Sequence, residues 1–243
     1  MLSSSGSNPP IQLKLAEEFL NGRILLFNKP MYWTSFDLVN KVKAIFRNRL
    51  GLKKIKIGHA GTLDPLATGL MVICTGKETR NIEKYQAQTK VYMAKIFMGA
   101  TTPSFDLETD VNAQFPIEHI DRSLVEKTLE GFIGTQPQVP PGYSARFVQG
   151  TRAYTLARKG ETPDLQPREI TVYELSLMSF VPPQIEIRVV CSKGTYIRAL
   201  ARDLGEKMNS GAYLSGLIRT AIGNFSIDQA LSIEEFERNF IFL

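Results

Sequence analysis

The spacing of apolar residues predicts helices and strands that follow one another irregularly along the chain. The clearest helix covers residues 34–50, because apolar side chains recur there at helical spacing. This apolar stripe consists of Leu38, Val39, Val42, Ile45 and Phe46. Thr34 and Asp37 have the spacing of a capping box, with Asp in place of the more common Glu, so the helix is expected to begin there.

Three further segments read as strands. Residues 70–75 and 91–98 are the first two, and the second alternates so that one side carries Tyr92, Ala94, Ile96 and Met98. Residues 185–191 form the third, followed by a turn and by a helix over 195–208. Shorter helices are predicted over 121–132 and from Ser232. Because a regular strand–helix rhythm is missing, the fold class is predicted to be α+β, with a mixed sheet.

Residues 136–168 differ from the rest of the chain, since prolines, aromatic residues and cations dominate there and apolar periodicity is weak. Such a segment is expected to be an insertion that becomes ordered when it binds a partner. Residues 1–20 are expected to form a disordered or loosely packed tail. Residues 21–243 are then expected to form a single domain.

The composition is that of an ordinary globular chain, with 243 residues, 43% hydrophobic and 22% charged. The net charge of +5 makes an anionic partner plausible. From residue 38 to residue 63 the chain has no acidic side chain, while seven cations fall there. They are Lys41, Lys43, Arg47, Arg49, Lys53, Lys54 and Lys56. These cations could form a surface that attracts the phosphates of a nucleic acid. The alternative is a helix face that is simply solvated.

The cysteines and histidines indicate no metal site. Cys74 and Cys191 lie in apolar runs, which is typical of buried thiols in a reducing compartment. The only histidines are His59 and His119, and no Cys/His spacing fits zinc. No signal peptide and no apolar run of membrane-spanning length is recognisable. The chain is therefore expected in the cytoplasm.

The most informative stretch is residues 58–69, Gly-His-Ala-Gly-Thr-Leu-Asp-Pro-Leu-Ala-Thr-Gly. Its single carboxylate belongs to Asp64, and Pro65 biases Asp64 towards an extended or turn backbone. Gly58, Gly61 and Gly69 allow other backbone or a ligand to come close. The stretch therefore presents one carboxylate at a candidate site. The commoner alternative for such a residue is a turn in which the side chain bonds its own backbone.

Two other kinds of site fit this part of the chain less well. A phosphate-binding loop at Gly76-Lys77 is excluded, because Glu78 stands where the motif needs Ser or Thr and no glycine lies five residues before Gly76. A glycosidase would need a second carboxylate. None is near Asp64 in sequence, although the fold could supply one.

Six stretches along the chain carry a resemblance to a known family. They are Asn-Lys-Pro at 28–30, the loop at 58–69, Lys-Val-Tyr at 90–92 with Met-Gly at 98–99, residues 136–146 with 154–160, Cys-Ser-Lys-Gly-Thr-Tyr-Ile-Arg at 191–198 with Asp-Leu-Gly at 203–205, and Leu-Ile-Arg-Thr at 217–220. In this order they resemble the motifs of the TruB family of tRNA pseudouridine synthases. Six collinear matches are far more specific than one.

The resemblance implies a pseudouridine-synthase fold, with a mixed, largely antiparallel sheet, flanking helices and an RNA-binding thumb at about 136–168. It implies one catalytic domain that converts uridine 55 in the T-loop of tRNA to pseudouridine by base flipping, as a monomer on the T-arm, without cofactor or metal. Ile218 departs from the family's arginine and Arg146 from its lysine. Many members continue into a PUA domain, whereas only a stub follows here. No complete PUA domain and weaker RNA affinity are therefore expected.

The resemblance also implies roles for individual residues. Asp64 would be the essential carboxylate, paired with Arg198, which would keep it ionised and oriented. Tyr92 would stack on the extruded uracil and could transfer a proton. Tyr196 and Leu217 would form walls of the base pocket, and His59 would support the reorganised T-loop. Lys29, Arg146 and Arg152 would bind phosphates. Core packing is the alternative for Tyr196 and Leu217, and a surface cation is the alternative for Arg198.

Two rival functions remain open at this stage. A non-catalytic tRNA-binding factor would need cations and aromatic residues but no central carboxylate. An RNA N-glycosidase would use Asp64 to cleave the same bond and let water capture the sugar. Free uracil among the products would favour the glycosidase.

Overall fold

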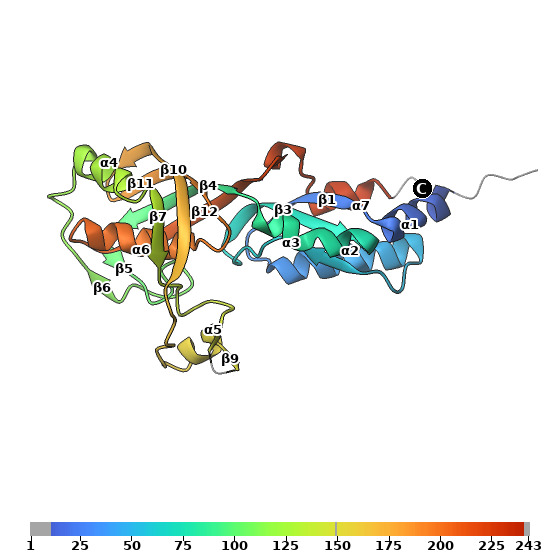
Figure 1. Cartoon of the computed structure of the whole chain (residues 1–243), viewed down its shortest axis with the longest axis horizontal. Coiled ribbons are helices and arrows are strands. Elements are labelled where there is room, and N and C mark those ends of the chain that lie inside the picture. Colours follow the sequence, from blue (N-terminus) through green and yellow to red (C-terminus); the bar gives the residue numbers. More distant parts are fainter. Residues whose placement is uncertain (1–10, 149, 241–243) are drawn as a thin grey trace, which may run out of the picture. The chain divides into compact units, whose positions relative to one another are not determined.

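The computed structural model describes residues 11–148 and 150–240, and Figure 1 shows the elements along the chain. The chain forms two compact units, one from residues 1–86 with 224–243 and the other from residues 87–223. Each unit is described by itself. The expectation of a single catalytic domain over residues 21–243 stays a prediction.

The first unit combines helices with a small antiparallel sheet, in which β3 pairs with both β1 and β2. Its elements are α1 (Ile11–Asn21), β1 (Ile24–Lys29), α2 (Ser35–Leu50), β2 (Ile57–His59), β3 (Ala67–Thr75), the 3₁₀ helix η1 (Gly76–Asn81), α3 (Ile82–Ala87), β13 (Phe225–Ser226), the 3₁₀ helix η2 (Ile227–Gln229) and α7 (Ile233–Arg238).

Helix α2 confirms its prediction from sequence. Thr34 is the N-cap and its hydroxyl accepts from the Asp37 amide, while the Asp37 carboxylate accepts from the Thr34 amide. All five residues of the predicted apolar stripe are buried. The helix ends at Gly51, whose φ of 67° is the left-handed conformation that glycine tolerates best.

An aromatic cluster forms much of the core of the first unit. The ring centroids of Phe19 and Phe46 lie 4.4 Å apart, and those of Phe27 and Phe236 lie 5.0 Å apart. Because Phe19 belongs to α1, this helix packs on the core. The tail predicted over residues 1–20 is therefore wrong for residues 11–20. There, the burial of Ala16 and Phe19 offsets the conformational entropy that the chain loses when it forms a helix. Residues 1–10 lie outside the described residues.

The second unit is built on an antiparallel sheet with the strand order β12-β4-β11-β10-β7. Its elements are β4 (Lys90–Met98), β5 (Ala100–Thr101), β6 (Ala113–Gln114), α4 (Arg122–Glu130), β7 (Gly134–Gln138), β8 (Phe147–Val148), β9 (Thr151–Arg152), α5 (Ala153–Ala157), β10 (Arg168–Val181), β11 (Gln184–Cys191), α6 (Ile197–Lys207) and β12 (Ala212–Ile222). The predicted α+β class and largely antiparallel sheet are confirmed.

The alternation predicted for β4 is also confirmed, since Tyr92, Ala94, Ile96 and Met98 are all buried. Helix α6 packs on β12 and β4, and its buried Leu200, Ala201 and Leu204 cover this face. Cys74 and Cys191 are buried free thiols, and burial raises the pKa of each to about 11.

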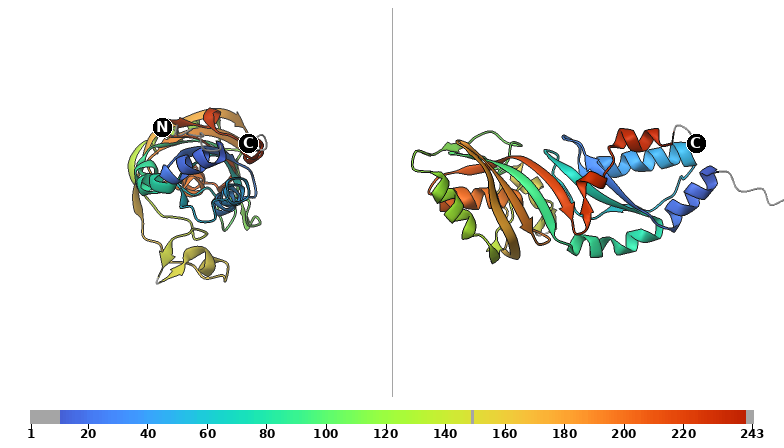
Figure 2. Two further views of the ribbon diagram at one scale, coloured as in Figure 1. Left: turned by 90° about the vertical axis from the view of Figure 1, so that its right-hand side faces the viewer. Right: turned by 90° about the horizontal axis from the view of Figure 1, so that it is seen from above.

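The segment between β7 and β10 extends away from the sheet of its own unit, as Figures 1 and 2 show. It contains a short antiparallel pair, β8 with β9, and the single-turn helix α5. Ala153 of this segment is fully buried. We call residues 139–167 the thumb segment.

None of the helices in the described part of the chain is long and apolar enough to cross a bilayer. Within residues 11–148 and 150–240, no group of three His, Cys, Asp or Glu side chains is placed to hold a metal ion.

Candidate active site

Asp64 lies in the loop between β2 and β3, and the residues on both sides of it are fixed by hydrogen bonds. Before it, the Ser35 hydroxyl accepts from the Leu63 amide at 2.8 Å and donates to the Leu63 carbonyl at 3.0 Å. Ser35 and Leu63 are buried, so these bonds are shielded from water. Gly61 has a φ of 114°, which a residue with a side chain would rarely adopt. The half-buried carboxylate therefore stands on a fixed backbone.

After Asp64, the Pro65 carbonyl accepts two hydrogen bonds. The Tyr32 amide donates to it at 2.7 Å and the Lys29 ammonium at 3.4 Å. Lys29 also donates to the carbonyls of Pro30 and Trp33, at 2.9 and 2.7 Å. The Lys29 side chain thus connects the turn before α2 to the loop that bears Asp64.

Lys29 was expected to bind phosphate at the surface, but the structure places its side chain in the interior. Its side chain is completely buried, and the three carbonyls surround its ammonium group. An ammonium group that replaces its hydration with carbonyls is not available to a phosphate at the surface. We therefore assign Lys29 to positioning the Asp64 loop.

In the second unit, Tyr92 lies on β4, which pairs with β12 on one side and β11 on the other. Arg219 of β12 is directly opposite it on one side and Val189 of β11 on the other. Leu217 of β12 is opposite Ala94. Directly opposite residues of an antiparallel pair point to the same face, so Tyr92, Leu217 and Arg219 share the face that α6 covers. Arg219 is 1% exposed.

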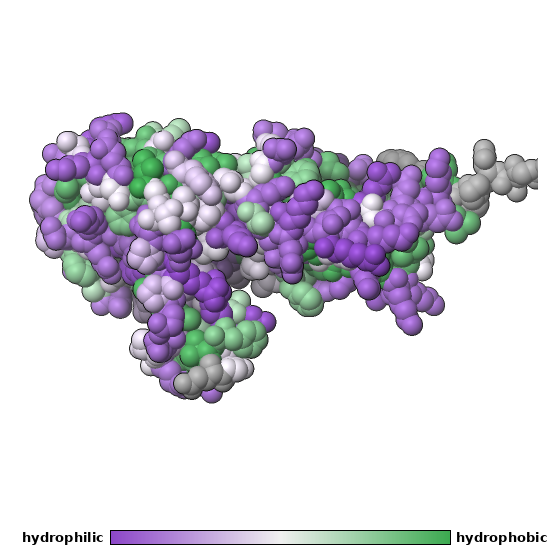
Figure 3. All heavy atoms as spheres, in the orientation of Figure 1, coloured by the Kyte–Doolittle hydropathy of each residue, from purple (hydrophilic) through white to green (hydrophobic). Residues whose placement is uncertain are grey.

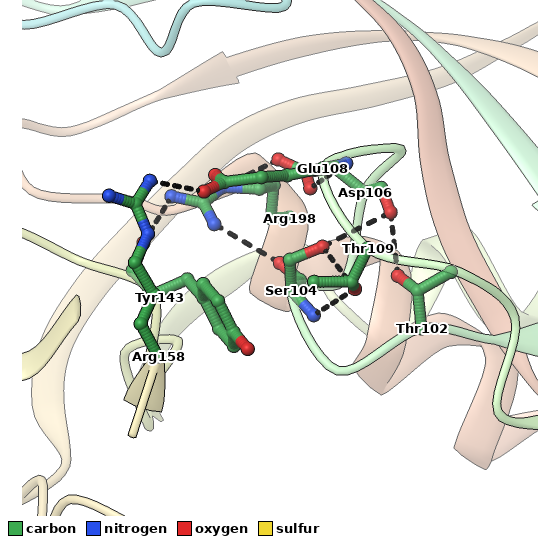
Figure 4. A network of polar contacts seen from close by, with 8 residues as sticks. All are labelled: Thr102, Ser104, Asp106, Glu108, Thr109, Tyr143, Arg158 and Arg198. Atoms are coloured by element: carbon green, nitrogen blue, oxygen red, sulfur yellow. Dashed lines mark hydrogen bonds and ion pairs between the residues drawn. The ribbon is translucent and has the colours of Figure 1, made fainter. Parts of the chain in front are cut away.

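Arg198, in the first turn of α6, is the centre of a buried polar network (Figure 4). Its guanidinium donates to the carbonyls of Ser104 at 3.1 Å and Tyr143 at 2.9 Å. Its Nε lies 3.5 Å from Oδ2 of Asp106. Both charged side chains are about nine-tenths buried or more, so the pair lies in a medium of low dielectric constant and the planar guanidinium is fixed.

The same network reaches the thumb segment. The Glu108 amide donates to Oδ1 of Asp106 at 2.9 Å, and the Glu108 carboxylate binds Arg158 at 2.6 Å. Glu108 raises the pKa of Arg158 through this bond. Tyr143 and Arg158 both belong to the thumb segment (Figure 4). Arg198 is therefore held by its own unit from two directions, the loop at 102–109 and the thumb.

Gln138, at the end of β7, fixes the backbone of Tyr196. Its side-chain amide donates to the Tyr196 carbonyl at 3.1 Å, and its side-chain oxygen accepts from the Tyr196 amide at 2.8 Å. Gln138 is buried, and Tyr196 is the N-cap of α6, two residues before Arg198. These two bonds fix the backbone where α6 begins, and we call them the Gln138 clamp.

We expect Gln138→Met to lower the free energy of unfolding by about 1–3 kcal/mol, because the partly buried amide of Tyr196 loses its acceptor. The exchange of the Tyr196 amide hydrogen with solvent should become faster, measured by NMR together with urea unfolding. Gln114→Met is the control, since Gln114 is exposed on β6. Unchanged exchange at Tyr196 would refute the clamp.

The other expected RNA contacts lie on the surface or at strand ends. Arg152 lies 4.1 Å over the exposed ring of Phe147 and donates to the Ala145 carbonyl at 2.6 Å. Arg146 is half-buried in the same thumb segment, where Figure 3 shows apolar residues at the surface. His59 ends β2, opposite Ile73 of β3. The structure thus groups the thumb cations with aromatic side chains.

Three residues of these sites were missed from sequence: Asp106, Gln138 and Arg219. Asp106 lies in a polar loop that gave no periodic signal, and its partner is 92 positions away, as the numbers of Asp106 and Arg198 show. Gln138 lies in the proline-rich stretch, and Arg219 follows Leu217 in a matched motif.

Asp64 belongs to the first unit, and Tyr92, Tyr196, Arg198 and Leu217 to the second. The pairing of Asp64 with Arg198 stays a prediction.

The chain matches a known family over most of its length. Residues 47–197 match the model of the TruB family pseudouridylate synthase, N-terminal domain. The matched stretch is more than half of the 243-residue chain, and it contains Asp64, Tyr92, Asp106, Gln138 and Tyr196.

Curated relatives are similar over nearly the whole chain. A tRNA pseudouridine synthase B of Phocaeicola vulgatus is 56% identical over 218 residues, which cover 90% of this chain and 93% of that protein. A protein of the same name from Flavobacterium johnsoniae is 50% identical, over 92% of this chain and 98% of its own. A third, from Chlorobium luteolum, is 41% identical, over 88% of this chain and 74% of its own.

Solved structures share the fold at low sequence identity. A chain in the crystal structure of a Cbf5–Nop10–Gar1 complex has a TM-score of 0.72 at 23% identity, over 98% of this chain and 62% of that chain. A chain in the structure of an H/ACA RNP bound to a substrate RNA has a TM-score of 0.68 at 20% identity. These two likenesses concern the fold alone. The family model and the curated relatives lead to one conclusion: this chain belongs to the TruB family of pseudouridine synthases.

Proposed function

We propose that this chain isomerises the T-loop uridine of tRNA to pseudouridine, with Asp64 as the essential carboxylate. The observation that carries the proposal is the fixed backbone around Asp64, held by Ser35 on one side and by Lys29 and Tyr32 on the other. A turn residue with no further task would not need hydrogen bonds on both sides, of which those with Ser35 are buried. The name of these relatives, tRNA pseudouridine synthase B, supports tRNA as the substrate.

The reaction needs no cofactor or metal, because substrate and product are isomers. The C1′–N1 bond of the uridine breaks, a C1′–C5 bond forms, and the proton from C5 leaves while N1 gains one. A negatively charged carboxylate can attack or stabilise the intermediate, or take up a proton, provided that it is ionised. In this proposal Arg198 pairs with Asp64 and favours the ionised form.

The uracil must leave the base stack to reach the half-buried carboxylate of Asp64. Tyr92 is proposed to stack on the extruded base, and its position on β4, a strand paired on both sides, suits a rigid wall. Leu217 shares that face of the sheet, and the Gln138 clamp fixes the backbone of Tyr196. Tyr196 and Leu217 are proposed to form the other walls.

The T-arm of tRNA is the proposed partner, bound by a monomer in the cytoplasm. Arg146 and Arg152 of the thumb segment are proposed to contact phosphates, and His59 to support the T-loop after the uridine has left it. Because the cations act through charge, the affinity for RNA should fall as the salt concentration rises.

The decisive experiment is incubation with unmodified tRNA, followed by mapping of pseudouridine at single-nucleotide resolution. Pseudouridine at the T-loop uridine alone supports the proposal. Free uracil and an abasic site would instead indicate the N-glycosidase, and bound but unchanged tRNA would indicate the binding factor. Either of these results overturns the proposed function.

A further inference from the structure

Three large apolar side chains are exposed beside the candidate catalytic loop, in the turn before α2 and in its first turn. The exposed fractions are 46% for Met31, 76% for Tyr32 and 64% for Phe36. We call these three residues the Tyr32 surface. Three large exposed apolar side chains within six residues are a candidate interaction site.

The backbone of Tyr32 strengthens this interpretation. Its φ of 68° lies in the left-handed region, which disfavours residues with a side chain by about 1–2 kcal/mol. A glycine would adopt this conformation without that cost. Since the ring lies largely in solvent, its burial within this chain does not compensate for the strain. A tyrosine here is better explained by what its ring contacts outside the chain.

The Tyr32 surface is tied to the catalytic loop by a direct bond. The Tyr32 amide donates to the carbonyl of Pro65, the residue that follows Asp64, at 2.7 Å. The buried Lys29 ammonium donates to the same carbonyl at 3.4 Å. A molecule that stacks on Tyr32 is therefore held next to the loop that bears the carboxylate, and both belong to the first unit.

The charges on the same side of α2 indicate the kind of partner. Phe36, Asn40, Lys43 and Arg47 follow one another at spacings of four, three and four residues, which places them on one stripe of the helix. Between residues 31 and 47 the only acid is Asp37, and its Oδ2 accepts from the amide and the hydroxyl of Thr34 at 2.9 and 2.7 Å. Aromatic rings next to cations suit nucleotides, whose bases stack while their phosphates meet the cations.

We propose that the Tyr32 surface is a stacking platform for unpaired bases of the RNA substrate, separate from the pocket of the reacting uridine. Phe36 provides a second ring, and Lys43 and Arg47 bind the phosphates that follow. The bases in a regular RNA duplex are already stacked, so the platform distinguishes loop nucleotides from paired ones. This proposal rests on the proposed function, since it names a further part of the same RNA.

Trp33 is the only tryptophan of the chain and adjoins Tyr32, so its fluorescence reports on this surface directly. The test is a fluorescence titration of the full chain with a T-arm stem-loop RNA and with a fully paired RNA of equal length. The stem-loop should change the Trp33 emission strongly and the duplex should not.

The variants are Tyr32→Gly, which also relieves the backbone strain, and Phe36→Ala. Each should weaken binding of the stem-loop by about 5- to 100-fold, which corresponds to the loss of one stacked base. KM for the stem-loop RNA should rise by a similar factor. Tyr173→Ala is the matched control, because Tyr173 is 51% exposed on β10 of the other unit.

The outcomes separate this proposal from the proposed function. If both variants bind the stem-loop as tightly as the parent chain while pseudouridine still forms, the platform is refuted and the function stands. If the variants lose affinity but the parent chain forms no pseudouridine, the platform stands and the function falls. An equal loss on duplex RNA also refutes the platform, as does a tight protein partner that competes with RNA for Tyr32.

Discussion

Replacing Asp64 by Asn should lower the rate of pseudouridine formation by about 10³-fold or more, because the amide can neither attack nor accept a proton. The change keeps the size of the side chain. The bonds that fix the loop come from the backbones of Leu63 and Pro65, so the fold should persist. Affinity for tRNA should change little. The rate is measured as the release of tritium from uridine labelled at C5, since that C–H bond must break.

Asp110→Asn provides the control for this experiment. Asp110 is an exposed aspartate in the loop after β5, so its neutralisation changes the net charge equally without touching the proposed site. It should keep the parental rate. Tritium release from Asp64→Asn at the parental rate would show that the carboxylate is not essential, and the residue would then be a turn former.

The second large effect is expected at the buried pair of Arg198 and Asp106. Arg198→Ala should lower the free energy of unfolding by about 3–5 kcal/mol, because Asp106 then stays buried without its countercharge. Pseudouridine formation should fall by at least about 10²-fold, since the guanidinium proposed to orient Asp64 is lost. Urea unfolding and the tritium assay measure the two effects on the same protein.

Two further variants separate stability from catalysis at Arg198. Arg198→Lys keeps the charge but not the planar fork that reaches Ser104, Asp106 and Tyr143, so activity should stay low while part of the stability returns. Arg122→Ala removes the exposed pair with Glu126 and should cost less than about 0.5 kcal/mol. An Arg198→Lys protein with full activity would make Arg198 a structural cation only.

The network around Arg198 connects the candidate site with the thumb segment. Arg158 of the thumb binds Glu108, whose amide bonds Asp106, which in turn pairs with Arg198. The Arg158–Glu108 pair is partly exposed, so its own contribution to stability is small. Its position matters more, because it adds a second connection between the thumb and Arg198, through Glu108 and Asp106, to the direct bond from Arg198 to the Tyr143 carbonyl.

The sequence by itself determined the local elements and the family. Hydrophobic periodicity and a capping box were enough for α2, and alternation was enough for β4, because these signals lie within a few neighbouring residues. The motif around Asp64 and the motif ending at Arg198 identified the TruB family for the same reason. The tail predicted over residues 1–20 was wrong where α1 forms, since the partner of Phe19 is Phe46, far along the chain.

Only the tertiary structure decided how the site residues are held. Lys29 looked like a phosphate ligand until its burial and its three carbonyl partners placed it under the Asp64 loop. Asp106 and Gln138 gave no signal, because each acts through a bond to a residue more than fifty positions away. A motif records which side chains are present. Which of them are buried and bonded to one another depends on contacts that exist only once distant segments have packed together.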